Sequence, residues 1–146
     1  MICAVAAVGF LSYPGPAVGE DAPSPQVEVF KSPTCGCCAK WADHLEASGF
    51  RVRTTDVADL QEVKRRHGVP PHSESCHTAI VDGYVVEGHV PASDIARLLR
   101  ERPEVRGLVA PGMPRGSPGM ESPTPEPYVV YTFDEAGHRA VFSRHE

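Results

Sequence analysis

The sequence predicts an α/β fold, and three observations support this expectation. A β-rich run (residues 27–31) is followed by a helical pattern and a second β-rich run (residues 50–55), which is the order of a β-α-β unit. Two short β-rich runs further on are separated by Asp82-Gly83, a strong hairpin signal that favours a type I′ turn. A last helical pattern begins at Pro91. The expected order is therefore β-α-β-α-β-β-α, with the first two strands parallel and the hairpin strands antiparallel.

The three helices are predicted from apolar spacing and from end signals. The first should present one apolar stripe to the sheet and end at Gly49. Its stripe consists of Cys38, Trp41, Ala42 and Leu45. The second begins at Asp59, with Glu62 three residues later in a capping-box-like arrangement, and ends at His67-Gly68. The third carries Ile95, Leu98 and Leu99 on one face.

This element order is that of a thioredoxin-like fold, which the sequence predicts for a domain at residues 27–102. Residues 103–127 form a Pro/Gly-rich arm, and within it residues 107–127 are so dense in Pro and Gly that neither helix nor sheet is expected. Residues 128–146 predict a β-hairpin, with alternation over residues 128–133 and a turn at residues 134–137. Since an isolated hairpin is marginally stable, it should dock on the core.

The N-terminal residues 1–19 carry no charged side chain. An apolar run over residues 3–11 precedes Pro, Gly and small residues, which resembles the core and cleavage site of a secretory signal peptide, with cleavage before Glu20 and a linker over residues 20–26. Because a basic segment is missing, an apolar tail is the alternative. We expect an exported protein with no membrane span in the mature chain, since no apolar run approaches the roughly 18 residues that a bilayer requires.

Composition excludes one large class of partners. The 146 residues include 14 Lys+Arg and 19 Asp+Glu, for a formal net charge of -5. No basic stripe offsets this acidity, so nucleic acid is not an expected partner.

Four cysteines carry the functional prediction. Cys35, Cys37 and Cys38 lie between the first strand and the first helix, where unpaired N–H groups and the positive end of the helix dipole favour thiolates. Cys76 directly precedes the strand at residues 78–81, and in a thioredoxin-like fold that loop passes beside the same helix end. We therefore expect the four sulfur atoms to meet.

Three interpretations of this cluster remain open. Structural disulfides are disfavoured, because a bridge within four residues constrains the unfolded chain little and adjacent Cys37 and Cys38 cannot pair without strain. A C-x-x-C redox pair of Cys35 and Cys38 fits the predicted fold. A soft-metal site of all four thiolates would select Cu(I) or zinc, and the third thiol inside the run favours this interpretation over the redox pair.

Further soft or borderline donors lie elsewhere in the chain. His77 adjoins Cys76, and Met113 and Met120 lie in the Pro/Gly-rich arm, where thioether ligands would suit Cu(I) and apolar anchoring of the arm is the alternative. His72 is a weaker candidate because it lies in the loop before Cys76. The remaining histidines outside the family motif are expected to be solvated, and these are His44, His67, His138 and His145.

The chain resembles a bacterial family of small exported metal-binding proteins, long catalogued as a domain of unknown function and associated with copper tolerance. The resemblance rests on Lys31-Ser32-Pro33-Thr34-Cys35-Gly36-Cys37-Cys38, Trp41, Gly49-Phe50, Val69-Pro70, Ser75-Cys76-His77-Thr78, Glu87-Gly88-His89-Val90-Pro91 and Pro111-Gly112-Met113-Pro114 through Gly119-Met120-Glu121. It covers nearly all of the chain from residue 27 onward.

The resemblance implies a non-catalytic, periplasmic Cu(I)-binding protein that sequesters copper or hands it over, with a thioredoxin-like core. The implied partners are the copper ion and other periplasmic copper carriers or exporters. The implied ligands are Cys35, Cys37, Cys38 and Cys76, joined by His77, Met113 and Met120. A thiol-disulfide oxidoreductase using Cys35 and Cys38 is the alternative function, and zinc is the alternative metal.

Overall fold

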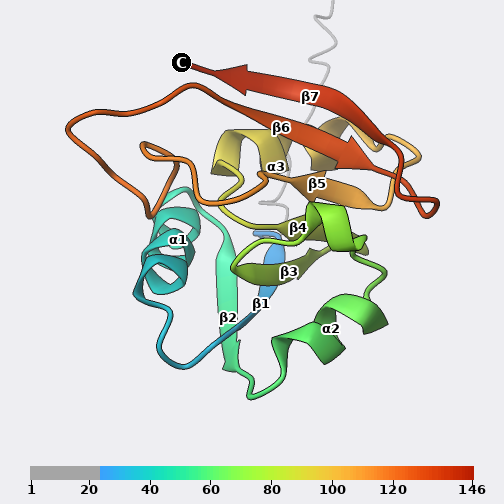
Figure 1. Ribbon diagram of the computed structural model, residues 1–146, viewed down its shortest axis with the longest axis horizontal. Helices are drawn as coiled ribbons and strands as arrows, with labels where there is room; N and C mark the ends of the chain where they lie inside the picture. Colours follow the sequence, from blue (N-terminus) through green and yellow to red (C-terminus); the bar gives the residue numbers. More distant parts are fainter. Residues whose placement is uncertain (1–23) are drawn as a thin grey trace, which may run out of the picture.

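The computed structural model describes residues 24–146, so the expected signal peptide and most of the expected linker lie outside the described residues. Figure 1 shows the arrangement of the elements. The strands are β1 (Gln26–Lys31), β2 (Arg51–Asp56), β3 (His77–Val81), β4 (Tyr84–Glu87), β5 (Gly107–Val109), β6 (Tyr128–Phe133) and β7 (Arg139–His145). The helices are α1 (Gly36–Ala47), α2 (Leu60–Arg66) and α3 (Ala92–Glu101), with a short 3₁₀ turn at Pro71–Ser73.

The strands form one mixed sheet in the order β2-β1-β3-β4-β5-β6-β7. β1 and β2 are parallel, β3 and β4 are antiparallel, and the predicted β-α-β-α-β-β-α order is confirmed. The β3–β4 turn has φ of 47° at Asp82 and 85° at Gly83. Two successive positive φ angles are the signature of the expected type I′ turn.

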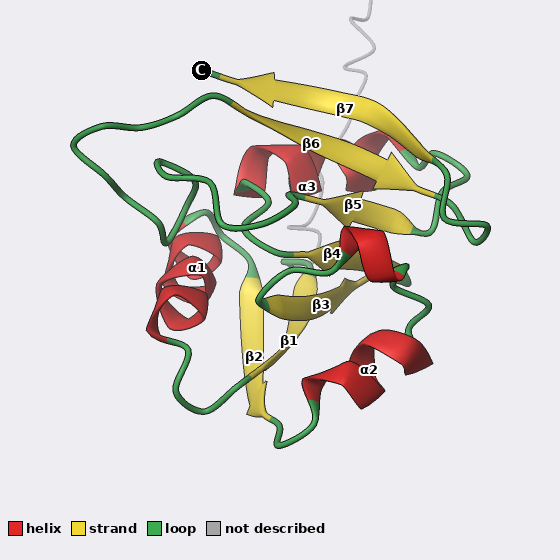
Figure 2. Ribbon diagram, in the orientation of Figure 1, coloured by secondary structure: helices red, strands yellow, loops and turns green. Residues whose placement is uncertain are grey.

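The helices divide between the two faces of the sheet (Figure 2). Trp41 and Leu45 of α1 and Ile95 of α3 belong to the larger apolar cluster, together with the alternating Val27 and Val29 of β1. The buried residues of α1 are the predicted stripe and no others. α2 contacts β1 and β3 on the opposite face, where a second cluster includes Val85 of β4.

The local end signals of the helices act as expected. The Asp59 carboxylate accepts the Glu62 N–H at 3.0 Å and so caps α2. Gly49 follows α1 with a φ of 92°, a conformation that glycine adopts without steric cost. In the described part of the chain, no helix combines the length and apolarity that crossing a membrane would take.

The expectation that residues 107–127 contain no sheet is wrong at their start. β5 is completely buried, pairs parallel with β4 and antiparallel with β6, and so joins the core to the C-terminal hairpin. At Gly107 a Cβ atom would lie 1.8 Å from the Val85 carbonyl oxygen, so the close approach of the two backbones requires glycine. Pro and Gly are dense only after Val109. The three residues of β5 have a strand on each side, β4 and β6, and these are enough to continue the sheet.

Beyond β5 the Pro/Gly-rich arm crosses to the N-terminal end of α1 and returns to β6, as the orange segment of Figure 1 shows. Gly119 lies against α1 with a φ of 85°. A Cβ atom there would lie 2.6 Å from the Cys37 carbonyl oxygen and 2.9 Å from the Trp41 nitrogen. The arm therefore packs closely over the end of α1 that carries the cysteines.

Candidate metal centre

The first half of the site, here called the helix half, consists of Cys35, Cys37 and Cys38. Cys35 is the N-cap of α1, and the other two lie in its first turn, which contains no acidic residue. The Cys35 N–H donates to the Ser32 carbonyl at 3.1 Å, which closes the turn between β1 and the helix. The N-terminal end of α1, where the helix dipole is positive, therefore lies at these sulfur atoms.

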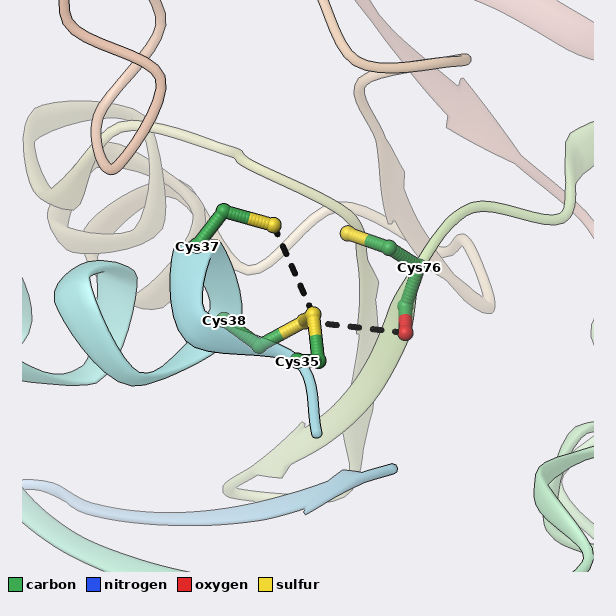
Figure 3. Close-up of side chains that lie close together, drawn as sticks. All are labelled: Cys35, Cys37, Cys38 and Cys76. Atoms are coloured by element: carbon green, nitrogen blue, oxygen red, sulfur yellow. Dashed lines mark hydrogen bonds between the residues drawn. A yellow bond between two sulfur atoms is a disulfide. The ribbon is translucent and has the colours of Figure 1, made fainter. Parts of the chain in front are cut away.

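Cys76 approaches from the loop before β3, and Figure 3 shows its side chain facing the helix half. The four Sγ atoms of Cys35, Cys37, Cys38 and Cys76 all lie within 4.8 Å of one another. Cys38 Sγ lies 3.7 Å from the Cys76 carbonyl oxygen. The expected meeting of sulfur atoms from positions distant in the chain is confirmed, and the set is able to hold a soft metal ion.

The structure also contains a disulfide between Cys35 and Cys38, while Cys37 and Cys76 are free. Cys37 Sγ lies 3.4 Å from Cys35 Sγ. The sequence disfavours a structural disulfide here, because a bridge within four residues constrains the unfolded chain little. That reason applies only to what a disulfide contributes to stability. The observed pair is the one that the redox interpretation uses, and the C-x-x-C spacing within one helical turn brings its ends together.

Three residues on the strand side form the second half of the site, here called the strand half: Cys76, His77 and His89. Together with Cys38 they make a second group whose ligand atoms lie within 4.8 Å of one another. His77 is fully buried, its ring 4.2 Å from that of Trp41, and its Nε2 has no hydrogen-bond partner among residues 24–146. A buried polar atom without a partner is rare, and a metal ligand is one role that accounts for it.

His89 was not among the predicted site residues. Its Nδ1 lies 2.6 Å from the Pro118 carbonyl oxygen, which can only accept, so Nδ1 carries the proton in the neutral ring. Nε2 then presents its lone pair to Cys76 Sγ, 2.9 Å away. Histidines that bind metals commonly donate their other N–H to a backbone carbonyl in this way.

A signal for His89 was nevertheless present in the sequence. In the β3–β4 hairpin Thr78 pairs with Glu87, so extending the same register two residues further brings position 76 opposite position 89. The predicted two-residue turn determines this register. Continuing it beyond the strands would have placed His89 beside Cys76.

Burial determines the protonation of the strand half. It lowers the pKa of His77 well below its ordinary value and lowers that of His89, so both rings are neutral and have free lone pairs. Burial, reinforced by the nearby Cys37, raises the pKa of Cys76 to about 11. Cys76 is therefore a protonated thiol in the metal-free protein, and it donates to His89 Nε2.

The two methionines of the arm differ in their placement. Met120 lines a surface hollow together with Cys37 and Lys40. Met113 is 47% exposed. It follows Gly112, whose carbonyl accepts the Ser75 hydroxyl at 2.7 Å beside Cys76. Neither methionine belongs to the Cys/His groups, and both lie on the outer side of the site.

The other histidines lie outside both donor groups. His72 contacts the Gly137 carbonyl at 2.9 Å, so it does not reach the cysteines. The expectation of solvated rings is wrong for three of them. His67 is half-buried and its ring stacks on that of Phe30. His44 Nε2 accepts the Ala92 N–H at the start of α3 (3.2 Å), and His145 Nε2 lies 2.8 Å from the Asp94 carboxylate. Sequence spacing could not show these contacts, because each joins elements far apart in the chain.

A family model described as "Protein of unknown function, DUF411" matches residues 73–120. The solved structure "Copper resistance protein copG- Form 2" has 44% sequence identity and a TM-score of 0.80, covering 84% of this chain and 99% of that chain. "Copper resistance protein copG- Form 1" has 45% identity and a TM-score of 0.79, covering 85% and 98%. No curated protein sequence gives a significant match. At this identity and coverage, the chain belongs to the same family as the copper resistance protein CopG, and its residues 73–120 carry the DUF411 match.

Proposed function

We propose that this protein binds Cu(I) in the periplasm and sequesters it or hands it to other copper carriers. The observation that carries the proposal is the meeting of four cysteine sulfur atoms within 4.8 Å of one another. Thiolates are soft ligands that select Cu(I), and the kinship with a copper resistance protein favours copper over zinc. Cys35, Cys37, Cys38 and Cys76 are the primary ligands.

The imidazoles of His77 and His89 extend this ligand set. Both are buried and neutral, and the His77 nitrogen nearest the sulfur atoms is Nδ1, 3.5 Å from Cys76 Sγ. Cys38 and Cys76 are common to the thiol group and the mixed group, so the two groups form one continuous site.

Loading of all four sulfur atoms requires the reduced protein. Opening the Cys35–Cys38 disulfide consumes two electrons and two protons, which an external dithiol supplies while it is itself oxidised to a disulfide. The two thiols formed then lose protons when they bind the metal. In the disulfide form, the free thiols of residues 24–146 are Cys37 and Cys76.

The arm offers donors for exchange. Met120 lines the hollow beside Cys37, and Met113 is exposed near the Cys76 loop. Thioethers bind Cu(I) and resist displacement by protons, so an exposed methionine provides a first or last contact for a copper ion passing between proteins. Both methionines are proposed as exchange ligands outside the sulfur cluster.

An anaerobic Cu(I) titration against a competing chelator tests the proposal. It uses the wild type and the variants Cys35→Ser, Cys37→Ser, Cys38→Ser and Cys76→Ser, all under reducing conditions. We expect tight binding by the wild type, weaker binding by the variants, and a rise in melting temperature on addition of copper. A melting temperature that stoichiometric Cu(I) leaves unchanged would refute the proposal, and zinc retained against a large Cu(I) excess would identify a zinc site instead.

The Cys35–Cys38 disulfide favours one alternative function, a thiol-disulfide oxidoreductase. An insulin-reduction assay distinguishes it from copper binding. Activity that survives Cys37→Ser and Cys76→Ser but is lost in Cys35→Ser would establish the enzyme, because only the C-x-x-C pair would then be needed.

A further inference from the structure

A buried ion pair lies between α2 and the sheet, on the face opposite α1. The Lys64 ammonium contacts a Glu87 carboxylate oxygen, and their side chains are 2% and 0% exposed. The Thr78 hydroxyl donates to the other Glu87 oxygen at 2.7 Å and accepts from Lys64 at 3.2 Å. Burial raises the pKa of Glu87, and the Lys64 charge and the hydrogen bonds oppose that rise.

One contact leads from this pair toward the candidate metal centre. Glu87 Oε1 also accepts the backbone N–H of Ser75 at 2.6 Å, and Ser75 directly precedes Cys76. The Ser75 hydroxyl donates to the Gly112 carbonyl of the arm at 2.7 Å. Gly88 packs against the Ser75 side chain, since a Cβ atom added at Gly88 would lie 2.5 Å from Ser75 Oγ. Ser75 is therefore held from three sides immediately before the cysteine.

The ion pair itself has no direct contact with the sulfur atoms. Side chains alternate along a strand, so Thr78 and Glu87 point to the α2 face, whereas His77 packs on Trp41 at the α1 face. Glu87 therefore reaches the site by contact through the main chain at Ser75, and its charge also helps to raise the pKa of Cys76.

Stability alone does not explain a buried ion pair. Well-packed apolar residues of similar volume often serve as well or better in the same place. What an apolar side chain cannot provide is an acceptor for the part-buried Ser75 N–H. A carboxylate in this position needs a compensating charge, which Lys64 provides.

We propose that Glu87 is a positioning residue, which holds the Ser75 N–H so that the Cys76 thiol faces the helix half, and that Lys64 keeps the Glu87 carboxylate in place. This inference deepens the proposed copper function and rests on it for its metal readout. In this inference, the buried Lys64–Glu87 pair determines the orientation of the Cys76 thiol.

Two matched double variants test the inference. Lys64→Met with Glu87→Gln and Lys64→Met with Glu87→Leu both remove both charges and keep similar volumes, but only glutamine retains an acceptor for the Ser75 N–H. We expect the glutamine variant to bind Cu(I) as the wild type does, and the leucine variant to bind about tenfold more weakly, as is typical when a supporting partner of a ligand is lost. Equal melting temperatures in the two would show that folding is not the cause.

A second readout needs no copper. In a Cys37→Ser background with the Cys35–Cys38 disulfide closed, Cys76 is the remaining free thiol in residues 24–146, so its rate of alkylation by a maleimide reports its position and exposure. We expect the leucine variant to differ severalfold from the wild type and the glutamine variant to match it. This comparison remains decisive even if the wild type binds no copper, in which case the proposed function fails separately.

Three results would overturn the inference. Both double variants could match the wild type in both readouts, or both could change equally, which would assign the effect to charge. Should the leucine variant not fold, amide hydrogen exchange of the wild type decides: a Ser75 N–H that exchanges as fast as an exposed loop amide has no lasting bond to Glu87. Slow exchange at this amide supports the inference.

Discussion

The two halves of the candidate metal centre hold their donor atoms in different chemical states. The helix half places three sulfur atoms at the positive end of α1, and two of them are joined in the Cys35–Cys38 disulfide. The strand half is buried, and burial raises the pKa of Cys76 to about 11 while it lowers the pKa values of His77 and His89. The helix half must therefore be reduced before all its sulfur atoms can bind a metal ion, whereas the strand half already holds neutral donors. A metal ion that bridges them must displace the Cys76 proton.

Removal of sulfur donors should cause the largest losses of Cu(I) affinity, and the losses should differ between cysteines. Cys76→Ser deletes the thiol that connects the two halves, so we expect Cu(I) affinity to fall on the order of 100-fold, because loss of an outer-shell partner alone typically costs 10–100-fold. The matched variant Cys37→Ser should cost less, since Cys37 belongs to only one donor group. Chelator competition measures both, and equal losses would contradict the distinction between the halves.

The pH dependence of copper binding should come next in size. With a pKa of about 11, Cys76 is protonated at neutral pH and must release its proton to bind as a thiolate. Its contribution raises Cu(I) affinity about tenfold for each pH unit up to its pKa. Titrations at several pH values would check this slope. In Cys76→Ser the slope should fall by one proton, and an unchanged slope would rule out Cys76 as the source.

The closure of the arm over the helix half predicts a stability effect. At Gly119 a methyl group would meet the Cys37 carbonyl and the Trp41 nitrogen, and the φ of 85° disfavours any other residue. We expect Gly119→Ala to lower the free energy of unfolding by about 1–3 kcal/mol and to weaken the bond between His89 and Pro118.

Gly36→Ala is the control for this prediction. Gly36 lies in α1, where an added Cβ has no neighbour within 4 Å, so the change should be neutral or stabilising. Urea unfolding curves of both variants provide the measurement. If Gly119→Ala were as stable as Gly36→Ala, the observed packing of the arm would not hold in solution.

The arm methionines should show the smallest effects. Met120→Leu, beside Cys37, is expected to lower Cu(I) affinity a few-fold, about 1 kcal/mol or less, because leucine keeps the volume and removes the sulfur. Met113→Leu should leave affinity unchanged, since its side chain is exposed, and should slow transfer of copper to an acceptor chelator. Stopped-flow transfer measures this. Identical rates in wild type and Met113→Leu would exclude Met113 as an exchange ligand.

Much of the local structure was predictable because it depends on neighbours in the chain. The buried stripe of α1, the Asp59 cap of α2 and the positive φ angles at Asp82-Gly83 all follow from spacings of a few residues. Residues 107–109 were missed for the opposite reason. Their strand exists because β4 and β6 offer hydrogen-bond partners on both sides, which Pro/Gly content does not reveal.

For the site itself, the sequence alone determined the helix half and the donor chemistry of Cys76, since the kinds of ligand and their position at a helix start are local properties. The tertiary structure decided which distant groups share that space: His89 beside Cys76, the Lys64–Glu87 pair behind it, and the arm across it. The physical reason is that protonation and positioning depend on burial and on contacts between distant segments, and these exist only once the sheet has brought its strands together.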